Sequence, residues 1–281
     1  MIQIGAFVST AGGVETAIIR AQALGLQSFM FFTSSPRSFT RRVITDDEAE
    51  RFRAAALEAG FQSSWIHGSY LMNFATANPS ALERCVNLLA ADLRDADRLG
   101  ARGVIVHIGS HGGRGFGAVR HQLVQVFTRV LSQAPGQSLL VFENAAGQAG
   151  AVGKDFTELA ELITAIADPR VVVCLDTQHA FAAGYPIHTA VGLEQVLKDF
   201  DHQIGLKRLV ALHVNDSKVP FDSARDRHEN IGAGEIGEGG LRLIARHPQL
   251  QGLPFLLEVP GEDGKGPDSV NVERLRKLVQ R

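Results

Sequence analysis

VVVCLDTQHAFAAGYP, residues 171–186, is the stretch around which the chain is organised. Its continuous run of apolar, β-favouring residues is typical of a strand buried on both faces of a parallel sheet. The run ends in Asp176, and His179 follows three positions later. Because an unpaired buried carboxylate is costly, the sequence predicts a cationic partner there. A metal ion is one candidate, since it accepts a carboxylate and a neutral imidazole, and a structural hydrogen bond is the alternative.

The same pattern of apolar runs and helical patterns repeats along the chain. The predicted strands cover residues 2–8, 28–32, 64–66, 103–107, 139–143, 171–176, 208–213 and 255–258. Apolar spacings of three and four predict helices over residues 14–24, 46–59, 80–99, 116–131, 156–165, 190–201, 239–246 and 270–279. Strands alternating with helices imply parallel βαβ units, and eight such units match an α/β fold of the (β/α)8 TIM-barrel type. An open, doubly wound sheet is the alternative, because alternation does not demonstrate closure.

Length and charge limit the classes of protein that are possible. The chain has 281 residues, which is normal for one barrel, so we expect a single domain over residues 1–281. A hydrophobic content of 45% is sufficient for a large core. The formal net charge of -2 does not attract nucleic acid or an anionic membrane to the whole surface. A site for a polyanion would therefore be a local patch, such as Arg37, Arg41 and Arg42.

The chain carries no sign of export or membrane insertion. Its two cysteines, Cys85 and Cys174, lie in a helical and a strand-like segment, which favours a reducing compartment over a disulfide framework. No apolar run approaches the ~18–20 residues that span a bilayer. The N-terminus lacks the basic region of a secretory signal. We therefore expect a soluble, cytoplasmic protein.

A histidine or an acidic residue stands at the end of six consecutive predicted strands. These residues are His67, His107, Glu143, Asp176, His213 and Glu258. In a barrel, the carboxyl ends of the strands meet at one mouth, where active sites are built. Any one of these residues alone could be a separately satisfied polar group. Six together indicate a shared site.

The loop after the seventh predicted strand adds a further pair. The segment RDRHENIG places Asp226 and His228 two positions apart, so in extended chain both face one side and can reach one ion. A solvated turn is the alternative for this pair. Imidazoles and carboxylates without cysteine suit Zn, Mn or Fe in a catalytic site. With His179 the candidates number nine, which fits three ions better than one, and multi-metal mouths of this kind point to hydrolysis of a phosphate ester.

The chain resembles the endonuclease IV family of apurinic/apyrimidinic (AP) DNA repair endonucleases over nearly its whole length. The blocks HGSYLMN, HIGSH, ENAAGQ, CLDTQHAFAAGY, HVNDSK and DRHENIGAGEIG look like those of the family, in its order. The resemblance implies a TIM barrel with three Zn²⁺ ions at the mouth, with Mn²⁺ as an alternative at some positions. The implied ligands are His67, His107 and Glu143 for the first ion, Glu143, Asp176, His213 and Glu258 for the second, and His179, Asp226 and His228 for the third.

The resemblance also implies an activity. The family cleaves the phosphodiester 5′ to an abasic site in duplex DNA, leaving a 3′-hydroxyl and a 5′-deoxyribose phosphate, and it trims blocked 3′ ends. The implied nucleophile is a hydroxide held between the first two ions, which Glu143 bridges. Glu258 would orient or deprotonate it. We expect the chain to act as a monomer.

Residues expected to contact DNA lie in the loops of the mouth. Arg37, Tyr70 and Leu71 match family positions that enter the duplex and hold an extrahelical nucleotide. Packing within the loop is the alternative for Tyr70 and Leu71. Contacts to the substrate backbone are expected from Asn215, Asp216 and Lys218. A solvated loop is the alternative for these three residues.

Four residues depart from the pattern of the family without being ligands. Phe7 stands where the family usually has His, Gly68 replaces a commonly acidic residue, Ile108 replaces a proline, and Gln178 stands where Cys is frequent. These departures affect the surroundings of the ligands and the substrate preference.

Two other functions remain open. A sugar isomerase or epimerase of the same barrel type would use Glu143, Asp176, His213 and Glu258, and would not need the other five candidates. A DNA-lesion binding module without turnover is the non-enzymatic alternative, although such a protein has no use for a complete ligand set.

Overall fold

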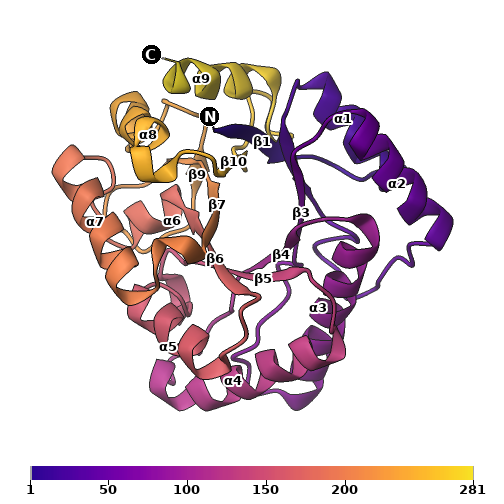
Figure 1. The fold of residues 1–281 in the computed structure, drawn as a ribbon. Coiled ribbons are helices and arrows are strands. Elements are labelled where there is room, and N and C mark those ends of the chain that lie inside the picture. The colour runs from indigo at the N-terminus through magenta and orange to yellow at the C-terminus, as the bar shows by residue number, and fades with distance from the viewer. Residues whose placement is uncertain (1, 281) are drawn as a thin grey trace.

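The computed structural model describes residues 2–280, and their strands close into a parallel barrel surrounded by helices (Figure 1). The barrel strands are β1 (Gln3–Phe7), β2 (Ser28–Phe31), β3 (Ser63–His67), β4 (Gly103–Val106), β5 (Leu139–Glu143), β6 (Val171–Asp176), β7 (Leu209–His213) and β10 (Pro254–Leu257). Their order around the ring is β1-β10-β7-β6-β5-β4-β3-β2. Closure confirms the predicted TIM barrel and excludes the open doubly wound sheet.

The eight predicted helices are present, with boundaries close to those expected. They are α1 (Glu15–Ala23), α2 (Asp46–Glu58), α3 (Pro79–Leu99), α4 (Phe116–Gln133), α5 (Phe156–Ile166), α7 (Ala190–Gln203), α8 (Gly237–Arg246) and α9 (Ser269–Val279). Local chemistry sets their ends. In α2, for example, Thr45 accepts the backbone N–H of Glu48 while the Glu48 side chain accepts that of Thr45, which is a capping box.

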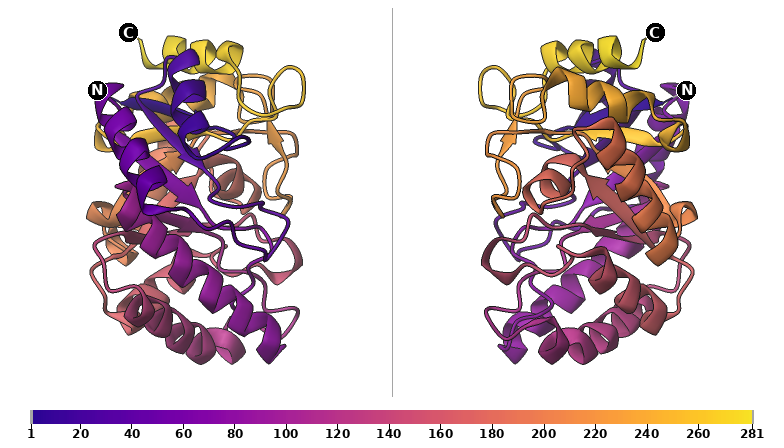
Figure 2. Two further views of the ribbon diagram at one scale, coloured as in Figure 1. Left: turned by 90° about the vertical axis from the view of Figure 1, so that its right-hand side faces the viewer. Right: turned by 90° about the vertical axis from the view of Figure 1, so that its left-hand side faces the viewer.

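Several short elements were not expected, because they contain too few residues for a periodic pattern. They are α6 (Thr177–Ala182), the strands β8 (Asp216–Ser217) and β9 (His228–Glu229), and the 3₁₀ turns η1 (Gln148–Gly150), η2 (Leu206–Arg208) and η3 (Pro248–Leu250). The strands β8 and β9 pair antiparallel, so the long loop after β7 folds back on itself. The long loops project together from one end of the barrel (Figure 2).

The inside of the barrel is filled by a layer of apolar side chains, which we call the barrel floor. It consists of Met30, Trp65, Ile105, Val141, Val172, Cys174, Ala211 and Leu256, all buried. Side chains two positions apart share a face of a strand, so the next inward position lies two residues further on. On β3, β4, β5, β6, β7 and β10 that position is His67, His107, Glu143, Asp176, His213 and Glu258. The period of the strands therefore stacks the predicted ligands directly on the floor.

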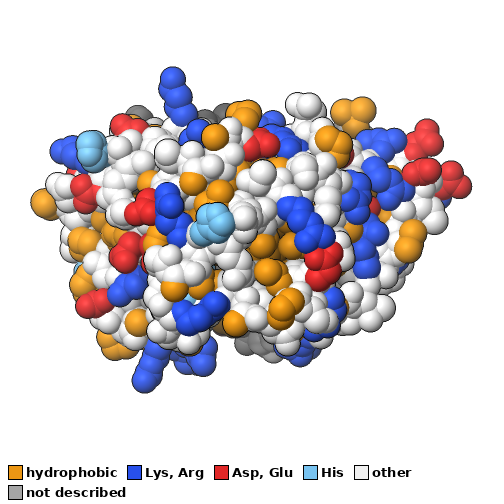
Figure 3. Space-filling model, turned by 90° about the horizontal axis from the view of Figure 1, so that it is seen from below, with side chains coloured by type: hydrophobic (Ala, Val, Ile, Leu, Met, Phe, Trp, Pro, Cys, Tyr) orange, Lys and Arg blue, Asp and Glu red, His pale blue; other side chains and the backbone are white. Residues whose placement is uncertain are grey.

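One flank of the molecule has mixed charge (Figure 3). On this flank, which includes α4, acidic and basic side chains are interspersed with apolar ones. Neither cysteine is in a disulfide, and both are buried. Within residues 2–280, no helix combines the length and the apolar character that crossing a bilayer requires.

Candidate metal centre at the barrel mouth

Ligand atoms from six strand ends form two overlapping groups at the mouth. Atoms of His67, His107 and Glu143 all lie within 4.8 Å of one another. The same is true of atoms of the second expected set, which consists of Glu143, Asp176, His213 and Glu258. Glu143 belongs to both groups. Its Oε2 lies 3.4 Å from Nε2 of His67, and its Oε1 lies 3.0 Å from Nδ1 of His213.

Asp226 lies close to both histidines of the third expected set. One carboxylate oxygen of Asp226 lies 3.4 Å from Nε2 of His179, and the other lies 3.4 Å from Nε2 of His228. Asp176 joins these two histidines in a further group of potential ligand atoms. The β8–β9 pairing, in which Ser217 faces His228, returns the loop to the mouth. All nine candidates from the sequence therefore lie in one cluster.

The cluster contains polar atoms that the protein itself does not satisfy. Nε2 of His67, His213 and His228 and Oε2 of Glu143 are buried and have no hydrogen-bond partner. Buried polar atoms without partners are rare in folded proteins. Imidazole nitrogens and carboxylate oxygens without a cysteine ligand are the donor set of catalytic Zn²⁺ and Mn²⁺ sites. The residues present therefore fit divalent cations of this class.

The electrostatics of the cluster keep its central carboxylates ionised. Burial alone would raise the pKa of Glu143, but His107, His213 and His179 outweigh it and hold that pKa well below its usual range. Burial likewise opposes ionisation of Glu258, yet His213 and His67 lower its pKa to about 2. Both groups are therefore charged at neutral pH and available as ligands or proton acceptors.

His179 responds in the opposite sense. Burial disfavours the charged form of His179, but Asp176 and Asp226 outweigh it and raise the pKa of this imidazole well above its usual value. A cation needs the neutral imidazole, so its binding at this residue displaces a proton.

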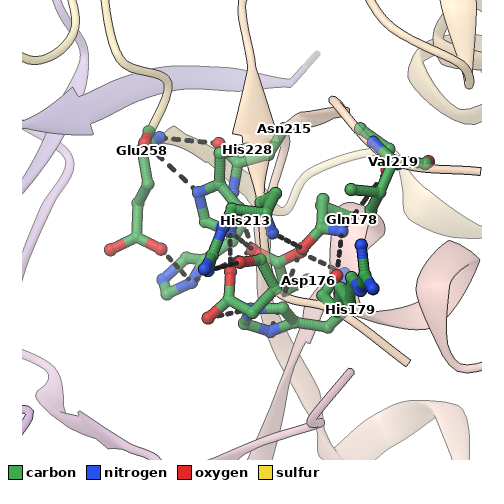
Figure 4. A network of polar contacts seen from close by, with 12 residues as sticks. Asp176, Gln178, His179, His213, Asn215, Val219, His228 and Glu258 are labelled. Atoms are coloured by element: carbon green, nitrogen blue, oxygen red, sulfur yellow. Dashed lines mark hydrogen bonds and ion pairs between the residues drawn. The ribbon is translucent and has the colours of Figure 1, made fainter. Parts of the chain in front are cut away.

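Two buried asparagines, Asn144 and Asn215, hold the ligands in place, and Asn215 is labelled in Figure 4. Asn215 Nδ2 donates to Oδ2 of Asp176 at 2.7 Å, and Asn215 Oδ1 accepts the backbone N–H of Glu258 at 2.9 Å. Asn144 Oδ1 accepts the backbone N–H of Asp176 at 2.6 Å. The carbonyl oxygen of Asn144 lies 3.0 Å from Nδ1 of His179. Sequence reasoning missed this role, although each asparagine stands one or two positions after a strand-end ligand.

Asn215 and Asp216, which were expected to contact substrate, are both buried. Asn215 is 0% exposed, and both groups of its amide are engaged with neighbouring strands. Asp216 is also 0% exposed, and its oxygens accept the backbone N–H groups of Gly234, Ile236 and Gly237 at the start of α8. Lys218, in contrast, is exposed, so its predicted contact with DNA stays a prediction.

The three residues expected to enter DNA lie in two joined loops at the rim. Tyr70 is 55% exposed and Leu71 is 42% exposed, and Arg37 is exposed as well. Ser69 Oγ donates to the carbonyl of Pro36 at 2.8 Å and accepts the backbone N–H of Leu71 at 3.2 Å. This hydroxyl therefore ties the loop of Arg37 to the loop of Tyr70 and Leu71.

The two strands without a ligand close the rest of the rim with aromatic rings. Phe7 and Phe32, from the ends of β1 and β2, pack with ring centroids 4.8 Å apart. Phe32 lies 5.4 Å from His67 and 5.2 Å from Tyr70, in both cases edge to face. Next to this wall is a pocket of 680 Å³, and on the other side a pocket of 440 Å³ reaches His107 and His179. The side chains at the mouth are thus polar at the ends of six strands and aromatic at the ends of the other two.

Comparison with known proteins gives consistent results. A family profile described as xylose isomerase-like TIM barrel matches residues 18–279. The chain is 36% identical over 277 residues to the "Probable endonuclease 4" of Halothermothrix orenii, covering 98% of this chain and 100% of that protein. Its structure is similar to the crystal structure of endonuclease IV from Thermus thermophilus, with a TM-score of 0.88, 37% identity and coverage of 99% and 98%. A D-tagatose 3-epimerase-like protein, at 15% identity and a TM-score of 0.71 over 99% and 97% of the chains, shares the fold alone.

Proposed function

This chain belongs to the endonuclease IV family and is an enzyme of the deoxyribonuclease IV type, and from that premise we propose that it cleaves duplex DNA 5′ to abasic sites with three metal ions. The products are a 3′-hydroxyl and a 5′-deoxyribose phosphate. The same site is proposed to remove blocking groups from 3′ ends, because that reaction hydrolyses the same kind of ester.

One observation carries the proposal. Asp226 lies 3.4 Å from both His179 and His228, which adds a third set of ligand atoms beside the groups around Glu143. A sugar isomerase of this fold would need only the four residues that include Glu258 and His213. All nine side chains come from one chain, so the proposed site is complete in a monomer.

The ligands are assigned by their grouping. His67, His107 and Glu143 would hold the first ion, Glu143, Asp176, His213 and Glu258 the second, and His179, Asp226 and His228 the third. We assign Zn²⁺, with Mn²⁺ as the alternative. When bound, such ions lower the pKa of water to about 7 and offset negative charge on the phosphoryl oxygens.

Glu258 is proposed as the proton acceptor. Its side chain is 10% exposed, whereas those of Glu143 and Asp176 are 0% exposed, so a water molecule can reach it. With a pKa of about 2 it is ionised at neutral pH. In the reaction, the water oxygen forms a bond to phosphorus while its proton passes to Glu258. The bond between phosphorus and the 3′-oxygen breaks, and the 3′-oxygen takes up a proton to become the hydroxyl.

Substrate recognition is assigned to the rim. Tyr70 and Leu71 present aromatic and apolar surface to solvent and suit insertion beside a missing base. Arg37 and Lys218 supply positive charge for the phosphates, which a chain of net charge -2 lacks globally. The buried Asn215 is excluded from this group.

The direct test is incubation with a duplex that carries one abasic site and a 5′ label. We expect a single cut that leaves a 3′-hydroxyl, which a polymerase extends. A matched duplex without the lesion stays intact. Absence of cleavage by the metal-loaded protein, or a cut 3′ to the lesion, would contradict the proposal.

A further inference from the structure

Gln178 is a buried residue next to the metal centre that has no place in the ligand set. It lies in α6 between the ligands Asp176 and His179, and it is 0% exposed. A buried side-chain amide is costly unless its donors and acceptor are all satisfied. The partners of this amide are therefore informative.

Gln178 bonds to the backbone on both sides of one ligand. Its Nε2 donates to the carbonyl of Arg225 at 2.9 Å, and its Oε1 accepts the N–H of Arg227 at 3.2 Å. These two backbone groups flank Asp226. The remaining amide hydrogen points to Oγ of Ser217, at 3.4 Å. The side chain thus pairs with residues 225–227 as a neighbouring strand would, and Figure 4 shows it across the cluster from Glu258 in that view.

The backbone of residues 225–227, to which Gln178 binds, is also held by a hydrogen bond from another part of the loop. The carbonyl of Arg227 accepts the N–H of Lys218 at 2.9 Å, next to the β8–β9 pairing. Just upstream, Asp222 and Ala224 have φ of 55° and 52°, in the left-handed region that L-residues rarely adopt. A loop with such a path relaxes unless other contacts hold it. Gln178 supplies two of those contacts, one on each side of Asp226.

From these bonds we propose that Gln178 is a positioning residue that sets the carboxylate of Asp226 against His179 and His228, and so forms the third metal site. The inference rests on the proposed function, because that function assigns Asp226 and His228 to an ion. It is specific to this sequence, since Cys is frequent at this position in the family and a cysteine cannot reach both backbone groups. Ser217 plays a supporting part, because its hydroxyl also binds the backbone of Val219.

The test compares Gln178→Met with a control of the same chemistry. Methionine keeps the length and shape of the side chain and loses all of its hydrogen bonds. Gln251→Leu is the matched control, because Nε2 of Gln251 also binds two backbone carbonyls, those of Ala245 and His247, but before β10 and away from the mouth. Three quantities are measured: metal ions per chain, hydrogen exchange of the Arg227 amide in the metal-free protein, and kcat and KM on abasic duplex DNA.

We expect Gln178→Met to hold one ion fewer than the wild-type protein, or to bind the third one about 10- to 100-fold more weakly. The Arg227 amide should exchange faster, and kcat should fall while KM stays within about twofold. The Gln251→Leu variant should lose thermal stability only. A Gln178→Met protein with a lower melting temperature but the full metal content and wild-type kcat would overturn the inference.

A second variant covers the case in which Gln178→Met does not fold. Gln178→Glu keeps the acceptor for Arg227 and loses the donor to Arg225, so an intermediate metal content is expected, and full metal content would again overturn the inference. The metal and exchange measurements need no DNA. A wild-type protein that binds three ions and leaves abasic DNA intact would therefore refute the proposed function without touching the role of Gln178.

Discussion

Asp226 Oδ2 lies 3.4 Å from Nε2 of His179, which joins the loop after β7 to the first turn of α6. The two residues come from different strand-to-helix connections, so this contact depends on the whole path of the loop between β7 and α8. The neighbouring contacts of Asp226 with His228 and of Gln178 with the backbone keep that path closed. These contacts together fix the position of the Asp226 carboxylate beside both histidines.

Removal of metal should abolish cleavage and preserve the fold. Dialysis against a chelator is expected to release three ions per chain and to lower the melting temperature, because ions that bind only the folded state stabilise it. Metal analysis, far-UV circular dichroism and cleavage of abasic duplex give the readouts. Return of Zn²⁺ should restore activity. Full cleavage by protein holding less than one ion per chain would contradict the assignment.

Glu258→Gln should remove the proton acceptor and leave the fold intact. The amide keeps the shape of the side chain but accepts no proton at neutral pH, so kcat should fall about 100- to 10,000-fold. Glu262→Gln is the control, because Glu262 is an exposed residue after β10 that pairs with Arg274. Near-normal kcat in Glu258→Gln would take Glu258 out of the reaction.

Replacing Tyr70 and Leu71 together by alanine should weaken binding of abasic DNA. Each residue that stacks on a base or fills the gap of a missing one contributes about 1–3 kcal/mol, so Kd should rise at least about tenfold. Metal content should not change. Leu57→Ala serves as the control, since Leu57 is 83% exposed on α2. Unchanged affinity in the double variant would assign both side chains to packing of their own loop.

Asp92 should make stability depend on pH. It is 2% exposed on α3, where it accepts the hydroxyl of Thr33 at 2.8 Å, and burial raises its pKa from 3.8 to about 7. Between pH 3.8 and about pH 7, Asp92 keeps its proton in the folded state and has lost it in the unfolded state. The contribution of this residue to stability therefore decreases as pH rises. Asp92→Asn should thus stabilise the protein at about pH 8, by up to a few kcal/mol since one pKa unit is worth about 1.4 kcal/mol.

At low pH, Asp92→Asn should have only a small effect on the free energy of unfolding. Below about pH 4 the carboxyl is protonated in both states, so the variant and the wild-type protein should differ little in their pH dependence there. Denaturant unfolding at several pH values gives the measurement. A difference between the two proteins that does not change from about pH 5 to about pH 8 would show that Asp92 does not titrate in this range.

Ala167→Gly should stabilise the end of α5. Ala167 caps this helix with φ of 55°, a left-handed conformation that glycine adopts without the penalty of a Cβ. The expected gain is about 1 kcal/mol, or roughly 2–4 °C in melting temperature for a protein of this size. Ala59→Gly at the end of α2 is the control, because its φ is -71° and glycine should destabilise it. Equal effects in both variants would refute the backbone explanation.

The sequence predicted the fold and the gathering of the candidate ligands at one mouth, for one shared reason. The continuous apolar run predicted a strand over residues 171–176, which is the observed range of β6. The two-residue period of a strand then puts Cys174 on the floor and Asp176 at the mouth. The predicted helix over residues 239–246 corresponds to α8, which begins slightly earlier. Patterns that repeat along the chain are visible in one sequence, and the cluster depends on such a pattern.

Long-range contacts could not be predicted in this way. Asn215 follows the ligand His213 and was expected to face DNA, but its backbone stays within the rim and its amide turns to Asp176. Gln178 was recognised only as a departure from the family, because its partners lie in a loop whose path the sequence does not specify. Asp92 lies among charged residues of α3 that are typical of a solvated face, and its hydrogen-bond partner Thr33 is distant in the sequence.

The barrel floor has a consequence for how the enzyme loads and keeps its cofactors. Beneath the ligands the interior is packed with side chains such as Trp65, Ile105 and Leu256, which are at most 2% exposed, so nothing charged can pass from that end. Any ion must therefore enter and leave at the mouth, which is the side where we propose that DNA docks. A duplex bound at the rim would block the exit of the ions. Chelators should therefore remove metal from the free enzyme faster than from the enzyme bound to its substrate.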